Sequence, residues 1–330
     1  MAFLSDFLMR LLAQFQSPTL GFLMGGMLIA ALGSKLKIPN AVYQFIVFVL
    51  LMKIGLKGGI EIRSSSWEEM ALPALCAAIV GVLTVIIGRY VLLRLPGITP
   101  QDGIATAGLF GAVSASTLAA AMVLLEEESL AYEAWVPALY PFMDIPALIL
   151  AIILATQQQH TKRVPIAKLI RESLRGSALS ALLLGLTLGL FTRSDSVLTS
   201  FYAPLFPGFL SVLMLVMGME AYARLHELRK VAHWYAVYAF FAPILHGLLA
   251  FGLGYIVHIT VGFSPGGVIL LAVMAASNSD ISGPPTLRSG IPSANPSSYI
   301  GASTSIGTPV AIVICIPLFI ALADMVFTLP

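Results

Sequence analysis

The chain has 330 residues, of which 58% are hydrophobic and only 10% are charged, and its formal net charge is +2. Soluble domains carry about 25% charged residues, so this composition excludes a water-soluble fold and favours a polytopic membrane protein. The small net charge gives no support for nucleic acid as a partner. Cys76 and Cys315 lie inside apolar runs, which indicates core residues and not a disulfide or metal framework.

Ten mostly apolar segments follow one another along the chain, and about 20 such residues cross a bilayer as a helix. A polar linker, residues 157–165, separates five segments from five, and the ninth is short with a proline-rich end. The predicted spans are residues 18–32, 41–60, 71–93, 103–125, 135–156, 166–191, 204–225, 232–261, 266–279 and 299–327. The sequence therefore predicts an all-α membrane protein with ten transmembrane helices.

The distribution of basic residues gives an orientation, because cytoplasmic loops are enriched in Lys and Arg. With the linker in the cytoplasm, 13 of the 18 basic residues lie inside. The five outside are Arg10, Lys53, Lys57, Arg63 and Arg193. This separation predicts that both termini lie outside, and we expect Lys53 and Lys57 to extend to the outer interface.

Five spans on either side of the linker, in opposite orientation, predict two inverted repeats, residues 1–160 and 161–330. Two pairs of runs align between the halves: 51–57 with 214–220, and 103–117 with 267–281. Chance similarity between membrane helices of like composition is the alternative. The alignment places a hydroxyl-rich interruption at corresponding positions of spans 4 and 9.

Interrupted helices at repeat-related positions indicate the substrate site of a transporter. Half-helix N-termini direct N–H groups at an anion, and carbonyls and hydroxyls suit a hard cation such as sodium. A single hydroxyl in a membrane helix more often only packs or bonds its own backbone, so the two clusters together favour a site. Their members are Ser114, Ser116 and Thr117 in span 4 and Ser277, Asn278 and Ser279 in span 9.

Two carboxylates lie at or near predicted membrane depth, where they are costly and indicate function. Asp144 stands between Pro141 and Pro146 in span 5, and these prolines are expected to open the helix. Asp280 ends span 9. The alternatives are a buried ion pair for Asp144 and a helix end at the interface for Asp280. His246, in span 8, has a proton relay as one interpretation, but such a histidine is more often a hydrogen-bonded packing residue.

Four runs in the chain are ATAGLFGAVS at 105–114, LYPFMDIP at 139–146, SDISGPPTLR at 279–288 and GIPSANP at 290–296. They resemble runs of the cyanobacterial sodium-dependent bicarbonate transporters (SbtA family). The resemblance extends from Phe3 almost to the C-terminus.

The resemblance implies sodium-driven bicarbonate uptake for a carbon-concentrating mechanism, by a homotrimer in the plasma (inner) membrane. Spans 4 and 9 would be broken and would cross. A core domain (spans 3–5 and 8–10) would move against a gate domain (spans 1, 2, 6 and 7). A PII-like protein, SbtB, would bind from the cytoplasm, although the linker 157–165 is shorter than the family's typical loop.

The sequence thus predicts a sodium–bicarbonate symporter, not an enzyme, with Na⁺ as coupling ion and no cofactor. A passive small-anion channel and a sodium symporter of another small anion are the alternatives. The expected anion site consists of Phe110, Gly111 and Ala112, through their N–H groups, with Ser114, Ser303, Thr304 and Ser305. The expected sodium site consists of Ser116, Thr117, Asp144, Ser277, Asn278 and Asp280.

Overall fold

The computed structural model describes residues 9, 12, 16–159, 165–231 and 233–327, and within these ranges the chain is helical and has no strand. The first half contains α2 (Pro18–Ala31), α3 (Asn40–Ile62), α4 (Trp67–Leu92), α5 (Pro100–Gly111), α6 (Ala115–Glu127), η1 (Val136–Leu139) and α7 (Tyr140–Gln159). The second half contains α8 (Ile166–Leu174), α9 (Ser177–Phe191), α10 (Asp195–Val197), η2 (Leu198–Tyr202), α11 (Ala203–Leu228), α12 (Trp234–Val261), α13 (Pro265–Ala276), α14 (Gly283–Gly290), α15 (Pro296–Ala302), η3 (Ser303–Gly307), α16 (Thr308–Val310), η4 (Ala311–Cys315) and α17 (Ile316–Phe327). The predicted all-α fold is confirmed.

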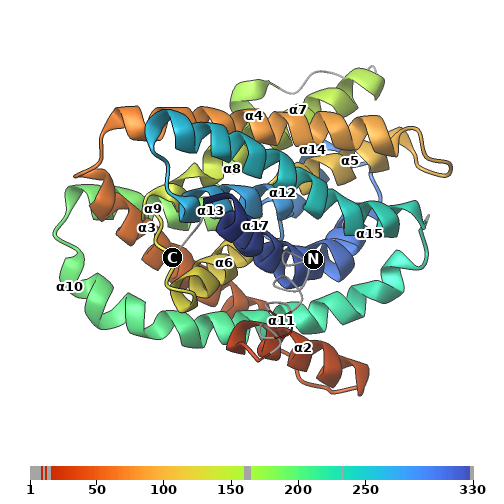
Figure 1. The fold of residues 1–330 in the computed structure, drawn as a ribbon. Coiled ribbons are helices and arrows are strands. Elements are labelled where there is room, and N and C mark those ends of the chain that lie inside the picture. Colours follow the sequence, from red (N-terminus) through yellow and green to blue (C-terminus); the bar gives the residue numbers. More distant parts are fainter. Residues whose placement is uncertain (1–8, 10–11, 13–15, 160–164, 232, 328–330) are drawn as a thin grey trace.

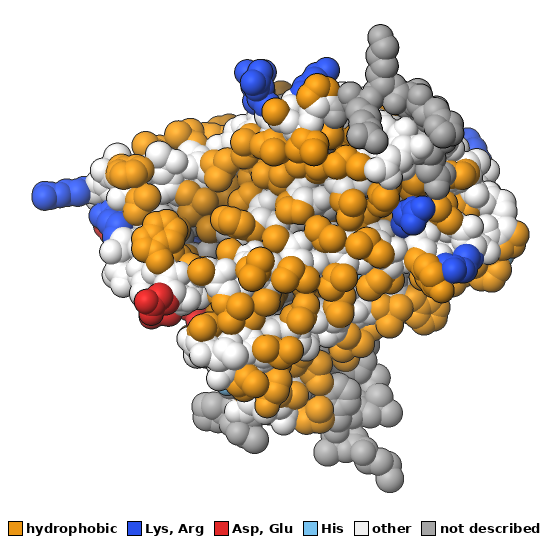
Figure 2. Space-filling view, turned by 90° about the horizontal axis from the view of Figure 1, so that it is seen from above, with side chains coloured by type: hydrophobic (Ala, Val, Ile, Leu, Met, Phe, Trp, Pro, Cys, Tyr) orange, Lys and Arg blue, Asp and Glu red, His pale blue; other side chains and the backbone are white. Residues whose placement is uncertain are grey.

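Six helical stretches among the described residues are long and apolar enough to cross a membrane. They are Trp67–Leu92, Pro100–Glu127, Val136–Gln157, Asp195–Leu228, Trp234–Val261 and Pro296–Phe327. Shorter apolar helices are Pro18–Ala31, Ser177–Phe191 and Pro265–Ala276. Figure 2 shows hydrophobic side chains over most of one face, with Lys and Arg toward its margins, as expected for a surface in contact with lipid.

The predicted sixth span, residues 166–191, is wrong as a single helix. α8 ends at Leu174, the chain turns at Arg175 and Gly176, and α9 begins at Ser177. The Ser180 hydroxyl donates to the Leu174 carbonyl at 2.9 Å and so satisfies one free carbonyl at the end of α8. An apolar run and an amphipathic helix joined by a short turn look continuous in a hydropathy profile.

Cap residues define where the two interrupted spans begin. Thr99 precedes Pro100 and accepts a hydrogen bond from the Asp102 N–H at 3.2 Å. Ser264 precedes Pro265 and accepts from the Gly267 N–H at 2.9 Å. A hydroxyl at the N-cap followed by proline starts a helix well, because proline needs no hydrogen-bond partner in the first turn. α5 and α13 therefore start in the same way.

Two helix pairs form one side of the molecule: α2 packs along α11, and α3 packs along α9. Figure 1 shows α2 and α11 together along one edge. Glycine permits the close approach, since a Cβ on Gly26 would overlap the Leu215 carbonyl oxygen and a Cβ on Gly218 would overlap that of Leu23. Small residues commonly bring membrane helices into backbone contact.

The remaining helices pack mainly among themselves. α4 contacts α5, α7 and α12, and α12 packs on α13. Figure 1 shows α4, α7 and α12 on the side opposite α2 and α11, with α6, α13 and α17 between. α5, α6 and α13 are among the most buried helices of the described chain, and 94% of the apolar 18-residue stretch within Pro100–Glu127 is buried.

Lys53 does not extend to an interface as expected. Its side chain is buried, with Nζ 3.7 Å from Glu126 Oε1 and 3.9 Å from the centre of the Phe206 ring. Lys57, one turn along α3, is half-exposed and lies 3.5 Å from the same carboxylate oxygen. The carboxylate that pairs with Lys53 belongs to Glu126 of α6, and nothing in the sequence indicated that α6 packs beside α3.

The glycine contact between α2 and α11 can be tested with a neighbouring glycine as control. We expect Gly26→Ala to lower the free energy of unfolding by about 1–3 kcal/mol, because the new methyl group overlaps the backbone of α11. Gly25→Ala, whose Cβ would meet no atom within 4 Å, should leave stability unchanged. Thermal unfolding of both variants in the same detergent checks this, and equal melting temperatures would contradict it.

Candidate functional site

The first interruption lies between α5 and α6. α5 ends at Gly111, and Ala112 and Ser114 adopt extended backbone before α6 begins at Ala115. The Ser114 hydroxyl accepts from the Thr117 N–H at 3.1 Å, so Ser114 is the N-cap of α6. A cap with this conformation ends one helix and starts the next at full burial.

The second interruption spans residues 277–282, between α13 and α14. The Ser277 hydroxyl donates to the Met274 carbonyl at 2.7 Å, at the end of α13. The Ser279 hydroxyl accepts from the Gly283 N–H at 2.8 Å, at the start of α14. Short hydroxyl side chains thus satisfy the helix ends that the break leaves free.

The two interruptions are hydrogen-bonded to each other. The Ser114 N–H donates to Ser277 Oγ at 2.9 Å, and the Ser279 N–H donates to the Leu109 carbonyl at 3.0 Å. All four residues are buried. The hydroxyl clusters predicted in spans 4 and 9 therefore lie together, and each provides partners for the other's backbone.

Asp144 lies beside the first interruption and is fully buried. Its Oδ1 accepts from the Val113 N–H at 3.0 Å, and its Oδ2 accepts from the Ser282 hydroxyl at 3.2 Å. The Tyr140 hydroxyl is 3.0 Å from the same Ser282 oxygen. The carboxylate thus connects the backbone of one interruption with a side chain of the other.

The expectation that prolines open the helix around Asp144 is wrong. α7 begins at Tyr140, so Pro141 lies in its first turn, where no N–H partner is needed. α7 then continues through Pro146 to Gln159. The change of helix type occurs before Asp144, where the 3₁₀ turn η1 gives way to α7.

Asp280 and Thr117 carry oxygen atoms whose hydrogen bonding is incomplete. Ser116 donates to Asp280 Oδ2 across the two interruptions. Asp280 Oδ1 and Thr117 Oγ1 are buried and have no hydrogen-bond partner among the residues that the structure describes. Buried oxygens of this kind are the ligands that a hard monovalent cation needs. The set therefore fits sodium, in line with the donor chemistry predicted for Ser116, Thr117 and Asp280.

Asn278 connects the second interruption with the last long span. Its Oδ1 accepts from the hydroxyls of Ser303, in η3, and Thr308, the latter at 2.8 Å. Its Nδ2 is buried and has no acceptor within the described part of the chain. The amide therefore offers a donor beside the interruption. η3 itself is π-helical, a distortion that often marks functional sites.

A comparison with known protein families identifies the chain. Residues 18–324 match the model of the Na⁺-dependent bicarbonate transporter superfamily. The chain belongs to this superfamily. It is therefore a transporter and not an enzyme, and the resemblance noted in the sequence is confirmed. No curated protein matches the transporter significantly.

Phe110, Gly111 and Ala112 do not present N–H groups to an anion. Phe110 and Gly111 are the last residues of α5, and the Ala112 N–H donates to the Gly108 carbonyl at 3.2 Å. The prediction of N–H donors is therefore wrong at Ala112, because the end of a helix leaves carbonyls free and not N–H groups. The Phe110 carbonyl lies 3.3 Å from His246 Nδ1, which agrees with the packing role expected for this histidine.

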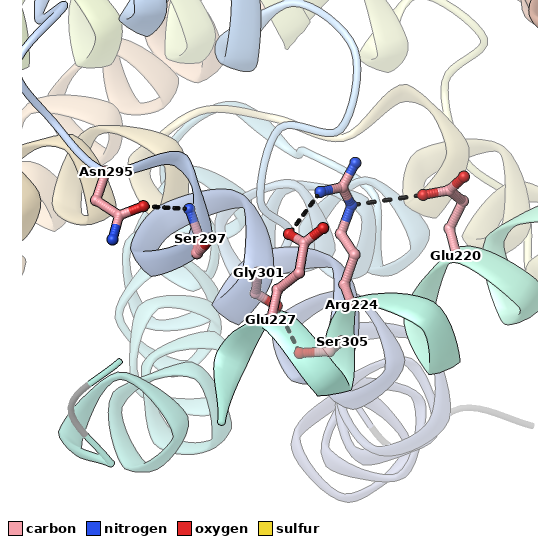
Figure 3. Close-up of polar contacts among 7 residues, drawn as sticks. All are labelled: Glu220, Arg224, Glu227, Asn295, Ser297, Gly301 and Ser305. Atoms are coloured by element: carbon pink, nitrogen blue, oxygen red, sulfur yellow. Dashed lines mark hydrogen bonds and ion pairs between the residues drawn. The ribbon is translucent and has the colours of Figure 1, made fainter. Parts of the chain in front are cut away.

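The polar run of the tenth span divides between two roles. Ser303 reaches Asn278, whereas the Ser305 hydroxyl donates to the Gly301 carbonyl of its own helix (Figure 3). Thr304 is half-buried. The internal bond of Ser305 is the common state of a serine in a membrane helix.

Three residues that the sequence did not assign to the transporter's site contact it. Ser282 donates to the Asp144 carboxylate, the Tyr140 hydroxyl bonds to Ser282, and Thr308 donates to Asn278. Ser282 and Tyr140 lie within the runs that carry the family resemblance, and Thr308 within the polar run 303–309. Their position in these runs was the only indication in the sequence that they belong to the site. The hydrogen-bond partner of each hydroxyl depends on how the helices pack.

Gly307 tests the role of the Asn278 amide. A Cβ on Gly307 would lie 2.8 Å from Asn278 Nδ2 and 2.8 Å from the Phe110 ring, so Gly307→Ala should displace one of them. We expect uptake to fall by at least about tenfold, the effect of about 1.4 kcal/mol. Gly301→Ala, in the adjoining α15 and with its closest contact at 3.8 Å, should transport normally.

Uptake by the two glycine variants is compared at matched amounts of protein in the membrane. Normal transport by Gly307→Ala would contradict a role of the Asn278 NH₂ group in transport. A loss in both variants would instead indicate that the helix tolerates no added methyl group.

Proposed function

We propose that the transporter imports bicarbonate together with sodium, with both ions held at the paired interruptions. The observation that carries this is the buried oxygen set of Ser116, Thr117 and Asp280, in which two oxygens lack hydrogen-bond partners among the described residues. An uncompensated carboxylate in this position is costly, and a sodium ion offsets that cost. Asp144 and Ser277 hold the interruptions in place around it.

The anion is assigned to the space beside the Asn278 amide, between the sodium ligands and η3. The N-terminus of α6, capped by Ser114, adds a positive dipole end, and Ser303 marks the far wall. Sodium and bicarbonate have opposite charges, so each ion raises the affinity for the other. Phe110, Gly111 and Ala112 act as the apolar wall and not as donors.

We further propose ten spans in two inverted repeats. Under this symmetry, spans 1 and 6 correspond, as do spans 2 and 7. The pair α2–α11 is then related to the pair α9–α3, and the similar starts of α5 and α13 are related too. These matched pairings support the repeat.

The same packing supports a two-domain mechanism. α2, α3, α9 and α11 would form a gate domain, and α4–α7 with α12–α17 would form a core domain that carries the ions. Elevator-like movement of the core along the gate would expose the site to each side in turn. A cavity of about 360 Å³ on the predicted cytoplasmic side is bordered by Tyr43, Ser177 and Ile281, the residue that follows Asp280.

Polar contacts connect the two proposed domains near the outer surface. Lys53, Lys57 and Glu61 lie one turn apart on α3; both lysines contact Glu126, and Glu61 accepts from the Trp135 N–H at 2.7 Å. The Tyr132 hydroxyl donates to Glu126 at 3.1 Å, and burial, with the nearby carboxylate, raises its pKa, so it stays a donor. We name Lys53, Lys57, Glu61 and Glu126 the outer ion-pair cluster.

The inner end of the gate is arranged differently. Arg224 of α11 pairs with Glu220 at 3.4 Å and with Glu227 at 3.1 Å, all on one helix (Figure 3). α15 lies beside it, with Asn295 capping its start through the Ser297 N–H. These ion pairs need not break when α15 moves along α11. The outer ion-pair cluster would have to break.

The cellular setting is proposed from the family resemblance. We propose a plasma (inner) membrane protein with both termini outside, assembled as a homotrimer and supplying inorganic carbon to a carbon-concentrating mechanism. A PII-like regulator of the SbtB type would bind its cytoplasmic face. A passive small-anion channel or a sodium symporter of another small anion remains the competing function, and the following experiments separate them.

The Asp280 carboxylate should set the sodium dependence. In proteoliposomes, labelled bicarbonate uptake by the wild type should require an inward sodium gradient. Asp280→Asn should raise the sodium concentration for half-maximal uptake by about 10–100-fold, because a buried charge-assisted interaction contributes about 1.5–3 kcal/mol. Asp195→Asn, exposed in α10, is the matched control and should behave as the wild type.

Two results would overturn this assignment. Uptake by the wild type without a sodium gradient would exclude coupling and favour the channel. An unchanged sodium dependence in Asp280→Asn would show that the sodium site lies at other residues.

Locking the outer ion-pair cluster should arrest transport. In a Cys76→Ala/Cys315→Ala background, Lys57→Cys and Glu126→Cys would be joined by a short reversible dithiol crosslinker. We expect uptake to stop and to recover on reduction, because α3 and α6 belong to the parts that must slide. The control pair Lys57→Cys/Thr199→Cys lines the same cavity of about 580 Å³ but lies within the proposed gate, so crosslinking should have little effect.

A passive channel needs no such movement. Continued uptake in the fully crosslinked Lys57→Cys/Glu126→Cys protein would therefore exclude elevator-like access.

A further inference from the structure

α8 presents three different sectors around its axis. Leu169 and Ser173, four residues apart, are each 2% exposed and face the protein. The next sector is apolar but exposed, and a third sector, on the far side from Leu169, carries the basic residues. α8 contacts α7, α9 and α14, so it lies at the protein surface between the last span of the first half and the first span of the second.

The exposed apolar sector consists of Ile166, Ile170 and Leu174, which are 53%, 38% and 39% exposed. Spacing by four residues places them in one stripe along the helix. Three large aliphatic side chains in water on a nine-residue helix would be costly, and the described chain leaves between 38% and 53% of each one uncovered. The adjoining α7 and α9 are apolar helices at the membrane, so the hydrocarbon boundary is the nearest apolar environment.

The basic sector consists of Lys168, Arg171 and Arg175, all exposed. The preceding linker adds Lys162 and Arg163 by sequence. Across residues 157–176 five basic residues stand against a single acidic one, Glu172. A basic sector that flanks an apolar one is typical of helices that lie in a membrane interface containing anionic lipids.

We propose that α8 lies in the cytoplasmic membrane interface and binds the headgroups of anionic phospholipids. Ile166, Ile170 and Leu174 enter the acyl region, and Lys168, Arg171 and Arg175 contact the phosphates. The assignment of α8 to the cytoplasmic side of the membrane rests on the proposed function, whereas its contact with lipid does not. Since α8 joins α7 to α9, bound lipid fixes the connection between the moving and the stationary helices of the proposed mechanism.

The position of α8 can be measured on the full chain. In the Cys76→Ala/Cys315→Ala background, Ile170→Cys and Lys168→Cys are each labelled with an environment-sensitive fluorophore. Both proteins are reconstituted into phosphatidylcholine vesicles that contain about a third phosphatidylglycerol. Brominated acyl chains should quench the label at 170 at least about threefold more than the label at 168. Aqueous iodide should show the opposite order. The depth difference between the two sectors is the physical reason.

Lipid choice is tested with the basic residues. Brominated phosphatidylglycerol should quench the label at 170 more strongly than brominated phosphatidylcholine at equal mole fraction. Replacing Lys168, Arg171 and Arg175 by Gln should abolish this preference. Replacing Lys35 and Lys37 by Gln, in another exposed loop on the predicted cytoplasmic side, should preserve it.

Quenching at 170 by iodide and not by brominated lipid would overturn the proposal and indicate a water-facing or protein-covered helix. Equal quenching by both lipids in the wild type would overturn the anionic preference. Neither readout depends on transport, so either failure can coexist with sodium-driven uptake. Conversely, loss of sodium coupling leaves the position of α8 unaffected.

Discussion

The architecture depends on a single constraint: backbone N–H and C=O groups at membrane depth must have partners within the protein. Each unsatisfied group costs several kcal/mol in hydrocarbon, so an isolated broken helix is not viable there. Here the two breaks satisfy one another through Ser114 with Ser277 and Ser279 with Leu109. The interruptions are stable because they are paired, and the surrounding helices pack around that pair.

This interdependence explains why acids occur beside the breaks. Asp144 accepts the Val113 N–H, which belongs to neither helix, and so completes the first interruption. Asp280 has one oxygen bonded to Ser116 and one left without a partner in the described chain. Both oxygens of Asp144 therefore have protein partners, whereas Asp280 keeps one that has none among the described residues, although both look alike as isolated acids in apolar sequence.

The sequence predicted what depends on local composition. Apolar runs located the helices, and the hydroxyl clusters located both breaks. It failed where a partner distant in sequence decides the outcome. Lys53 is buried because Glu126 and Phe206 pack against its ammonium group. Ala112 offers no free N–H because it follows the C-terminal end of α5, where its N–H bonds to the Gly108 carbonyl.

The hydrogen bonding of Asn278 restricts what can be recognised. Because Ser303 and Thr308 both donate to Oδ1, the amide cannot rotate by 180° without losing both bonds. Its NH₂ group therefore faces a fixed direction, and glycine at 307 avoids the methyl group that would press against it. Such an orientation discriminates by polarity: it accepts a lone pair and repels a proton donor. A planar oxyanion satisfies that demand, whereas a bare cation at the same point does not.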